Sequence, residues 1–374
     1  MPKRLEAWTN RSRDKISAPH PAQTSFPGEL IVRDDRIVIL AAPEIDDLLC
    51  GKEKDIIEIT RRAYLAHADG LSSLPHSTFL RFPEAEKNRI IALSAYLGGE
   101  FELAGIKWIS SFPENIQRGR DRASAVIVLN SLDHGRPEAI LEGSLISAKR
   151  TAASAALATQ HLADLETTEL GLIGCGVINS EILRFIHVLR PQLEKIFLFD
   201  LDPRRSRECA NRCQEHFPAL TFEIARDMET VFKNCRLISF ATTAATPHLM
   251  HDSVFSPGTV ILHISLRDLG PEIILKANNI VDDIDHVCRA QTSIHLAEQQ
   301  VQHREFITGT IAQVISGSVK LQSGGGRKTI FSPFGLGILD LAVAAYVHKQ
   351  ANGRSVGTEI SNFFPGSVNS AAYA

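Results

Sequence analysis

A glycine-rich turn between a short apolar run and a helical pattern constrains this chain more than any other feature. Residues 169–173 are apolar after the first, two glycines follow, and apolar residues then recur at helical spacing over 177–189. A strand, a tight glycine turn and a helix in this order bind a dinucleotide, because the pyrophosphate is held at the helix N-terminus. The predicted backbone ligands are Gly174, Cys175, Gly176, Val177 and Ile178.

Two neighbouring positions refine this prediction. Asn179 replaces the third glycine of the pattern, and we expect it to loosen the contact between helix and strand. Asp200 ends the next apolar run, where a carboxylate accepts hydrogen bonds from ribose hydroxyls and repels a 2′-phosphate, so NAD is favoured over NADP. The alternative is that Asp200 only caps the helix after Pro203. Arg204 and Arg205 follow closely and would soften the preference.

Length and composition set the class of protein. A chain of 374 residues is long enough for two domains, and its net charge of −3 gives no reason to expect nucleic acid or a membrane surface as a partner. No apolar run approaches the roughly 18 residues of a membrane span. The six cysteines form no C-x-x-C pair and no zinc spacing with histidine, so we expect no metal and a reducing, cytoplasmic setting.

The order of the patterns predicts an α/β protein with two domains. Residues 1–27 are polar and read as an extension, and 353–374 as a tail without periodicity. Strand-like runs and one helical stretch at 42–68 predict a mixed or antiparallel sheet in an α+β domain over 28–146, joined again by 329–352. An alanine-rich helix opens 147–322, where regular alternation predicts a Rossmann-type, doubly wound parallel sheet.

Several motifs together resemble the ornithine cyclodeaminase/mu-crystallin family over about residues 28–350. They are 105–108 (Gly-Ile-Lys-Trp), 149–153 (Lys-Arg-Thr-Ala-Ala), 174–176, 264–268 (Ile-Ser-Leu-Arg-Asp), and 332–335 (Ser-Pro-Phe-Gly) with Asp340. Residues 105–115, 121–126 and 174–179 are most similar to the 2,3-diaminopropionate-forming dehydrogenases within that family. The resemblance implies NAD-dependent oxidation of N-(1-amino-1-carboxy-2-ethyl)glutamate to 2-oxoglutarate and L-2,3-diaminopropionate, a siderophore or antibiotic precursor.

The resemblance also implies residue roles. Lys107 and Asp268 match the catalytic pair, the lysine as a proton acceptor and the aspartate as activator of the water that attacks an imine. Arg150 matches the arginine that grips a substrate carboxylate. The alternatives are a solvated lysine at a strand edge, a helix N-cap before Pro271 and a surface charge. We also expect Thr242, Ser265 and Leu266 to contact the cofactor.

The substrate end departs from the family pattern. The upstream arginine is absent near His76, which is either a ligand or a structural histidine, and Arg81 is the other candidate replacement. A substrate with three carboxylates needs further ligands, for which Arg122 and Ser124 are candidates. Their alternative roles are a charge at a strand entry and a turn serine.

Other functions within the family, and a homodimer, are also compatible with the sequence. The family also contains lyases that recycle NAD while converting ornithine to proline and ammonia, and ligand-binding proteins like mu-crystallin; an imine reductase is a further alternative. Net formation of NADH separates the dehydrogenase from the lyase. The apolar runs at 89–97 and 124–130 offer more sheet than the helices of the first domain cover, so we expect a homodimer built from that domain.

Overall fold

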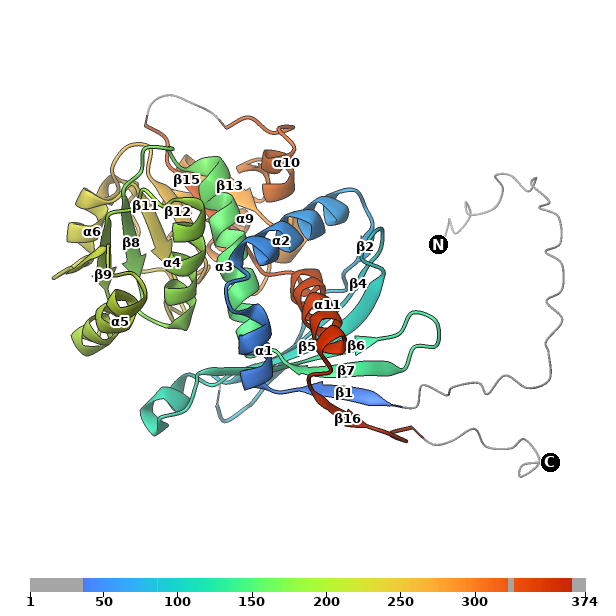
Figure 1. Ribbon diagram of the computed structural model, residues 1–374. Coiled ribbons are helices and arrows are strands. Elements are labelled where there is room, and N and C mark those ends of the chain that lie inside the picture. The colour runs from blue at the N-terminus through green and yellow to red at the C-terminus, as the bar shows by residue number, and fades with distance from the viewer. Residues whose placement is uncertain (1–35, 86, 322–325, 365–374) are drawn as a thin grey trace, which may run out of the picture. The chain divides into compact units, whose positions relative to one another are not determined.

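Two eight-stranded sheets organise the residues that the computed structural model describes, 36–85, 87–321 and 326–364 (Figure 1). The expected extension at 1–27, the strand-like run at 29–32 and the end of the tail lie outside these residues. Within them, no helix is long and apolar enough to cross a membrane, and no group of three or more metal-binding side chains gathers.

The first sheet is mixed, as the sequence predicts. Its order is β16-β1-β7-β6-β5-β4-β2, and β3 also pairs with β4. Every pairing is antiparallel except that of β1 with β7. The strands are β1 (Ile37–Leu40), β2 (Ser72–Ser73), β3 (Thr78–Arg81), β4 (Arg89–Leu97), β5 (Leu103–Ser111), β6 (Ala123–Asn130), β7 (Pro137–Glu142) and β16 (Thr358–Ile360).

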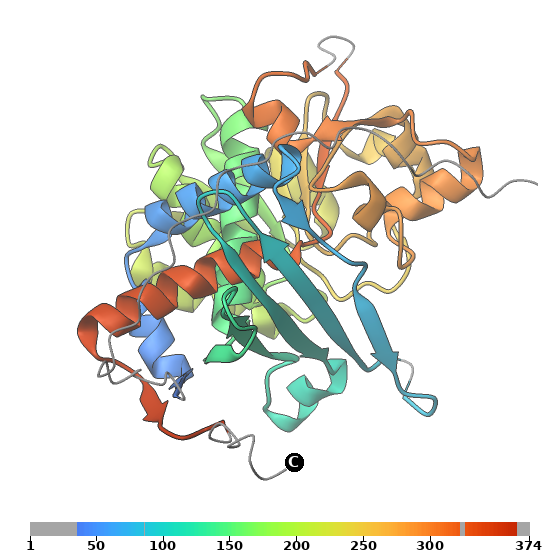
Figure 2. The same ribbon diagram turned by 90° about the vertical axis from the view of Figure 1, so that its right-hand side faces the viewer.

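The two faces of the first sheet differ. Lys107 lies opposite Leu93 and Ile127 in the ladder, and these side chains share the inner face. Helix α11 (Gly337–Arg354) runs across that face (Figure 2), so close that Leu341 would touch a side chain at Gly105. The outer face instead exposes large apolar side chains: Leu80, Tyr96 and Trp108 are 47%, 41% and 41% exposed.

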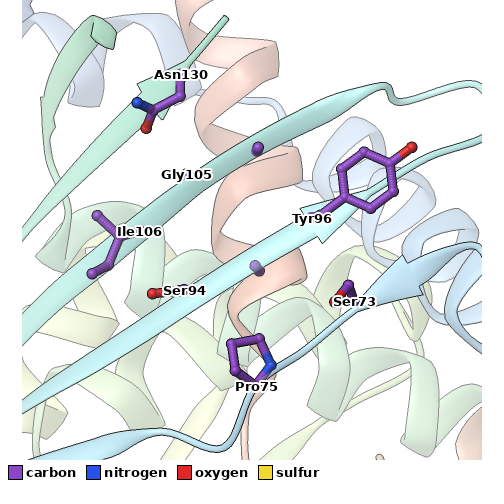
Figure 3. Close-up of a pocket in the computed structure, with 9 residues that line it drawn as sticks. Ser73, Pro75, Ser94, Tyr96, Gly105, Ile106 and Asn130 are labelled. Carbon is purple, nitrogen blue, oxygen red and sulfur yellow. The ribbon is translucent and has the colours of Figure 1, made fainter. Parts of the chain in front are cut away.

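A shallow hollow of about 390 Å³ lies over the outer face of strands β4 and β5 (Figure 3). Tyr96, Ile106 and Asn130 point into it from these strands and β6, and Pro75 borders it. Successive side chains of a strand point to opposite faces, so this hollow and Lys107 lie on opposite sides of the sheet. The hollow is therefore separate from the predicted catalytic residues.

The remaining helices of the first domain begin with α1 (Ala42–Leu49) and α2 (Glu53–Ala68). The sequence predicted one helix over 42–68, but the chain turns at Gly51, whose φ of +69° interrupts the helical path. Both helices bury an apolar face in the same core, which includes Leu48, Ile56 and Tyr64. Because of this break, one continuous apolar pattern forms two helices that run in different directions.

Helix α3 (Ser144–Leu162) connects the two sheets and packs against both α2 and α4 (Val177–Leu189). Glu142 accepts hydrogen bonds from the backbone N–H groups of Ser144 and Leu145, at 2.7 and 3.1 Å, which satisfies two free donors at its start. Arg190 donates to the carbonyls of Thr159 and Ala163 at its end. Buried alanines line the helix and allow the close approach of its neighbours.

The second sheet is parallel throughout, with the order β10-β9-β8-β11-β12-β15-β13-β14. Its strands are β8 (Glu169–Ile173), β9 (Lys195–Phe199), β10 (Thr221–Ile224), β11 (Leu237–Phe240), β12 (Val260–His263), β13 (Asn278–Val281), β14 (Ile307–Thr310) and β15 (Thr329–Ser332). The connecting helices include α5 (Pro203–His216), α6 (Met228–Asn234), α7 (Pro271–Lys276), α8 (Ile284–Val287), α9 (Ser293–Val301) and α10 (Ile311–Ile315). The order reverses between β8 and β11, which confirms the doubly wound prediction.

Three segments differ from the sequence predictions. Strand β15 pairs with β12 and β13, so residues 329–332 belong to the parallel sheet and not to the first domain, where the sequence placed them. The sequence pattern after residue 285 indicates helix throughout, but strand β14 interrupts it. Strand β16 pairs with β1, so part of the expected tail completes the first sheet. Short strands that pair with partners far away in the sequence show little local pattern from which their pairing could be predicted.

Candidate active site

The glycine turn adopts the geometry that its sequence predicts. Gly174 has a φ of +90°, and a side chain there would lie 2.6 Å from the carbonyl oxygen of Ala241. Gly176 caps the start of α4, and the only atom near its missing side chain is a guanidinium nitrogen of Arg205 at 3.6 Å. The N–H groups of Gly174 and Cys175 donate to Phe199 and Asp200 within the protein, and those at the start of α4 lie at a helix N-terminus, which suits a phosphate.

Asn179 does not loosen the helix–strand contact, contrary to expectation. Its side-chain amide is fully buried and donates to the carbonyls of Ile173 and Gly174, at 3.0 and 2.7 Å. Its carbonyl oxygen accepts a hydrogen bond of 2.7 Å from Ser239 on β11. The amide thus replaces the missing glycine by bonding the turn to two strands.

Asp200 lies directly beside the glycine turn. Its carboxylate accepts hydrogen bonds from the backbone N–H groups of Cys175 at 2.8 Å and Asp202 at 3.0 Å. Arg205 Nε lies 3.4 Å from the same carboxylate. The alternative role as a helix cap is wrong, because Asp202 caps α5 through the backbone N–H of Arg204.

A buried cluster of four polar side chains forms around Lys107. Asp340, in the first turn of α11, accepts from Lys107 Nζ at 2.6 Å with one oxygen and from Arg150 Nε at 2.9 Å with the other. Ser147 Oγ lies 3.2 Å from Lys107 Nζ and 3.4 Å from an Arg150 nitrogen. One fully buried carboxylate therefore orients two cations from different elements, and the start of α11 favours its negative charge.

Burial lowers the pKa of Lys107 to about 8, because removing the ammonium from water disfavours its charged form. The Asp340 carboxylate opposes this shift and the Arg150 charge adds to it. Trp108, the neighbour of Lys107 in the motif, points to the opposite face of β5 and is 41% exposed. The desolvation of Lys107 instead follows from its inner-face position beneath α11.

A tight loop after β15 holds Arg150 from the other side. Gly335 has a φ of +93°, and a side chain there would lie 3.1 Å from Arg150 Nη1. The buried carboxylate of Asp282 accepts hydrogen bonds from the backbone N–H groups of Phe334 at 2.8 Å and Gly335 at 2.6 Å. Burial raises the pKa of Asp282, and these N–H groups oppose that rise.

Asp268 lies in a separate cluster after β12. Thr242 and Ser265 donate hydroxyl hydrogen bonds to its two carboxylate oxygens. The side chain of His248, 38% exposed, places Nε2 3.2 Å from Asp268 Oδ1, and His263 Nε2 lies 3.4 Å from Oδ2. Both oxygens of Asp268 are thus enclosed, while the imidazole of His248 reaches solvent.

These contacts keep Asp268 ionised. Burial acts to raise the pKa of its carboxyl, but His248, His263 and Ser265 together hold it far below the ordinary range. A carboxylate with so low a pKa is a weak proton acceptor by itself. Thr242 and Ser265, expected to contact the cofactor, both donate to this carboxylate. Leu266 beside them has a φ of +67°, an uncommon conformation for a residue with a side chain.

The remaining predicted substrate ligands divide into three outcomes. Ser124 lies on the outer face of β6, exposed and hydrogen-bonded to Ser110 at 2.8 Å, so the structure does not bring it to Lys107. Arg122 donates to Ser111 Oγ at 2.9 Å on the inner side. His76 stacks edge-on against His286, with ring centroids 5.4 Å apart, and His286 also contacts Phe334 in the Gly335 loop.

Sequence reasoning missed several members of these clusters. Asp340 appeared only as part of a motif, although it is the shared partner of Lys107 and Arg150. Ser147 and Asp282 carried no signal beyond their positions at the start of a helix and the end of a strand. His248 follows a loop rich in threonine and alanine, and no local pattern links it with Asp268, twenty residues away.

The fold and these clusters define an α/β protein with a mixed sheet, a dinucleotide-type parallel sheet and a buried lysine–aspartate–arginine cluster. The model of the ornithine cyclodeaminase/mu-crystallin family matches residues 52–355, and the chain belongs to that family. The family resemblance of the motifs is thereby confirmed.

Individual relatives share most of the chain. It is 29% identical over 311 residues to the N-((2S)-2-amino-2-carboxyethyl)-L-glutamate dehydrogenase of Staphylococcus aureus, covering 82% of this chain and 92% of that one. The Thermococcus litoralis Delta(1)-pyrroline-2-carboxylate reductase, solved with NADH and L-proline, is 25% identical, with a TM-score of 0.81 over 87% of this chain and 100% of that one. An archaeal alanine dehydrogenase dimer with bound NAD is 26% identical, with a TM-score of 0.78 over 88% and 100%.

Proposed function

We propose that this protein is an NAD-dependent dehydrogenase that cleaves N-(1-amino-1-carboxy-2-ethyl)glutamate to 2-oxoglutarate and L-2,3-diaminopropionate. The observation that carries the proposal is the buried Lys107–Asp340–Arg150 cluster, which pairs a proton acceptor with a carboxylate-binding cation. The similarity to the Staphylococcus aureus dehydrogenase supports this reaction among those of the family.

NAD fits the site around the glycine turn. The N–H groups at the start of α4 suit its pyrophosphate, and Asp200 lies where a ribose hydroxyl would hydrogen-bond. Both solved relatives described above contain NAD or NADH. When bound, this cofactor supplies the hydride acceptor for oxidation of the glutamyl carbon that carries the secondary amine.

Lys107 and Arg150 serve the first step. The secondary amine must lose its proton before its carbon gives up hydride, and an amine with a pKa of about 8 can accept that proton near neutrality. Arg150 has a guanidinium suited to two parallel hydrogen bonds with a carboxylate, which would fix the reacting carbon. Asp340 holds both cations in place, and the Gly335 loop lies against Arg150.

Asp268 serves the second step through His248. Water adds to the imine carbon, and the resulting carbinolamine breaks its C–N bond to release 2-oxoglutarate and the primary amine of diaminopropionate. The imidazole of His248 can accept the proton of that water, and Asp268 at 3.2 Å can stabilise the imidazolium that forms. Asp268 therefore acts as a positioning residue for the imidazole.

Rapid mixing of enzyme, NAD and the glutamate-derived substrate tests these roles, with NADH and 2-oxoglutarate followed separately. We expect Lys107→Ala to abolish the first burst of NADH, since loss of a positioned base costs on the order of 10²–10⁴-fold in rate. We expect Asp268→Asn and His248→Gln to retain most of the burst but to release 2-oxoglutarate slowly. Loss of the burst in Asp268→Asn with retention in Lys107→Ala would reverse the assignment.

The same assay separates the other family reactions. L-ornithine, L-proline and L-alanine are the comparison substrates. Proline and ammonia formed from ornithine without net NADH would identify a cyclodeaminase. NADH formed rapidly from proline or alanine, with none from the glutamate-derived compound, would identify an amino-acid dehydrogenase or imine reductase and overturn the proposal.

We further propose a homodimer formed through the outer face of the first sheet. Leu80, Tyr96 and Trp108 expose apolar side chains on this one face, beside the hollow lined by Ile106 and Pro75. Burial of such a face against a second copy removes apolar surface from water. The alanine dehydrogenase relative is described as a dimer.

The product and the thiols suggest where the enzyme acts. L-2,3-diaminopropionate would supply a siderophore or antibiotic precursor, as the family branch implies. All six cysteines are free thiols, five of them buried, which is consistent with a cytoplasmic enzyme supplied with NAD. Detection of the protein by fractionation with a cytoplasmic marker tests the compartment.

A further inference from the structure

Arginine side chains form a row at one end of the inner face of the first sheet. Arg81 on β3 lies directly opposite Arg89 on β4, and Arg89 lies opposite Ser111 on β5. Paired residues share a face, and Ser111 is four residues from Lys107 on the same strand, so this row faces the same side as Lys107. Arg122 extends it by donating to Ser111 Oγ at 2.9 Å.

A fourth arginine approaches from the second sheet. Arg267, next to Asp268, is anchored by a hydrogen bond of 2.7 Å from Nη2 to the carbonyl of Ala290. Burial, together with the positive charges of Arg267, Arg122 and Arg81, lowers the pKa of Arg89 to about 10. Arg89 therefore feels the positive charge of the other three arginines, and Arg267 feels that of Arg81. The four arginines come from both sheets.

In the part of the chain that the structure describes, this row of arginines lacks a carboxylate partner at contact distance. Within residues 36–85, 87–321 and 326–364, none of the four arginines forms an ion pair with a carboxylate side chain at contact distance. Arg89 Nε is buried without a hydrogen-bond partner. The Asp268 carboxylate attracts Arg267, but its two oxygens already accept hydrogen bonds from Thr242 and Ser265.

Such an arrangement destabilises the fold unless a ligand offsets it. Like charges directly opposite each other on neighbouring strands repel, and a half-buried cation without a carboxylate partner adds to that cost. Arg81 also stacks over Phe79, with its guanidinium carbon 5.7 Å from the ring centroid, which orients it. The row of arginine side chains is therefore suited to bind an anion.

We propose that Arg81, Arg89, Arg122 and Arg267 bind the distal carboxylates of a polycarboxylate substrate and so set the specificity of the enzyme. This inference rests on the proposed function for the identity of the reaction. Ser111 lies roughly 13 Å along β5 from Lys107 at about 3.3 Å per residue. A substrate held at Arg150 by one carboxylate can extend its others toward the row, and the long arginine side chains close the remaining distance.

Arg89 and Arg267 are the new members of this site. A planar guanidinium matches the two oxygens of a carboxylate, so several guanidiniums discriminate strongly between one, two and three carboxylates. Simple amino acids such as alanine and proline offer no group to the row. The site therefore distinguishes a glutamate-derived secondary amine from the substrates named for the other relatives.

Steady-state kinetics of Arg89→Met test the proposal, with Arg62→Met as the matched control. Arg62 is a similarly half-buried arginine of the first domain, but it pairs with Glu100 on the surface. We expect Arg89→Met to raise KM for the glutamate-derived substrate roughly 10- to 100-fold with a much smaller change in kcat, since it removes charge-assisted binding away from the reacting atoms. An unchanged KM would overturn the proposal.

Calorimetric binding to the NADH-loaded enzyme gives a readout that does not depend on turnover. The probes are 2-oxoglutarate with two carboxylates, 2-oxobutyrate with one, and inorganic phosphate. We expect 2-oxoglutarate to bind wild type at least 10-fold more tightly than 2-oxobutyrate, and Arg89→Met and Arg267→Met to remove that difference. Equal binding of the two acids, or tighter binding of phosphate than of 2-oxoglutarate, would overturn it.

These measurements separate failure of the site from failure of the reaction. Dicarboxylate selectivity that Arg89→Met removes, without NADH formation from the proposed substrate, would reject the reaction and retain the site. NADH formation with an unchanged KM in Arg89→Met would reject the site alone. A melting temperature of Arg89→Met at or above that of wild type is also expected, since a purely structural arginine would lower it when replaced.

Discussion

Lys107 illustrates how one residue acquires its chemistry from its position. In the sequence it is one lysine of a Gly-Ile-Lys-Trp motif, and only the motif indicated a role. In the structure its ammonium is buried, which lowers its pKa, and it contacts Ser147 and Asp340, whose carboxylate opposes that shift. The partner Asp340 is 233 residues away in the chain. No local pattern encodes such a contact, so the residue was predictable and its environment was not.

The pKa of Lys107 predicts the pH dependence of the reaction. If the neutral amine accepts the substrate proton, kcat/KM should rise with pH through about 8 and level off above it. The pKa of Lys107 in the folded protein lies below its ordinary value of 10.5. Between about pH 8 and pH 10.5 the unfolded chain therefore binds a proton that the folded protein has lost. The free energy of unfolding should rise with pH across this range because of Lys107. Measuring kcat/KM and the melting temperature as functions of pH checks these two predictions. A Lys107→Met variant should show neither rise with pH.

Asp200 and Arg205 form the predicted basis of cofactor choice. We expect Asp200→Ser to bring the kcat/KM values for NAD and NADP within about tenfold of each other, because it removes the acid that repels a 2′-phosphate and frees Arg205 from its 3.4 Å pair. Asp202→Ser, which removes a carboxylate at the same turn but keeps a capping side chain, is the control and should keep the preference for NAD. Equal use of both cofactors by wild type would contradict the assignment.

At the scale of elements, periodicity predicted the strands and helices of the parallel sheet well. Apolar runs of four to six residues between helical patterns correspond to β8 through β13. The same reasoning failed for β15, whose four residues pair between β12 and β13 although β13 precedes it by nearly fifty positions. Which strands become neighbours depends on the packing of the whole sheet, and four-residue runs contain too little information to specify it.

Helix α11 contributes a charge that two other elements require. Asp340→Asn would leave Lys107 and Arg150 buried without their shared carboxylate, and we expect a loss of about 3–5 kcal/mol in the free energy of unfolding. Denaturant unfolding measures it. Asp47→Asn, at an exposed residue that pairs only loosely with Arg354, is the control and should behave like wild type. An unfolding free energy of Asp340→Asn equal to that of Asp47→Asn would contradict this expectation.

At the scale of the whole molecule, the two faces of the first sheet have different tasks. The inner face contains the polar clusters and the outer face exposes apolar side chains, as expected for a surface that a second copy covers. We expect light scattering to give twice the chain mass of 41.1 kDa at micromolar concentration. Trp108→Glu should produce a monomer, while Leu165→Glu, at a loop residue that is 73% exposed, should not. A monomeric wild type would reject this interface.

The position of α11 in the sequence has a consequence for synthesis. Lys107 and Arg150 leave the ribosome long before Asp340, so the nascent chain carries two cations whose buried counter-charge does not yet exist. The inner face of the first sheet likewise waits for α11 to cover it. Strand β16 then closes the sheet edge beside β1. A ribosome stalled before residue 337 should therefore hold a chain in which the Lys107–Asp340–Arg150 cluster has not formed.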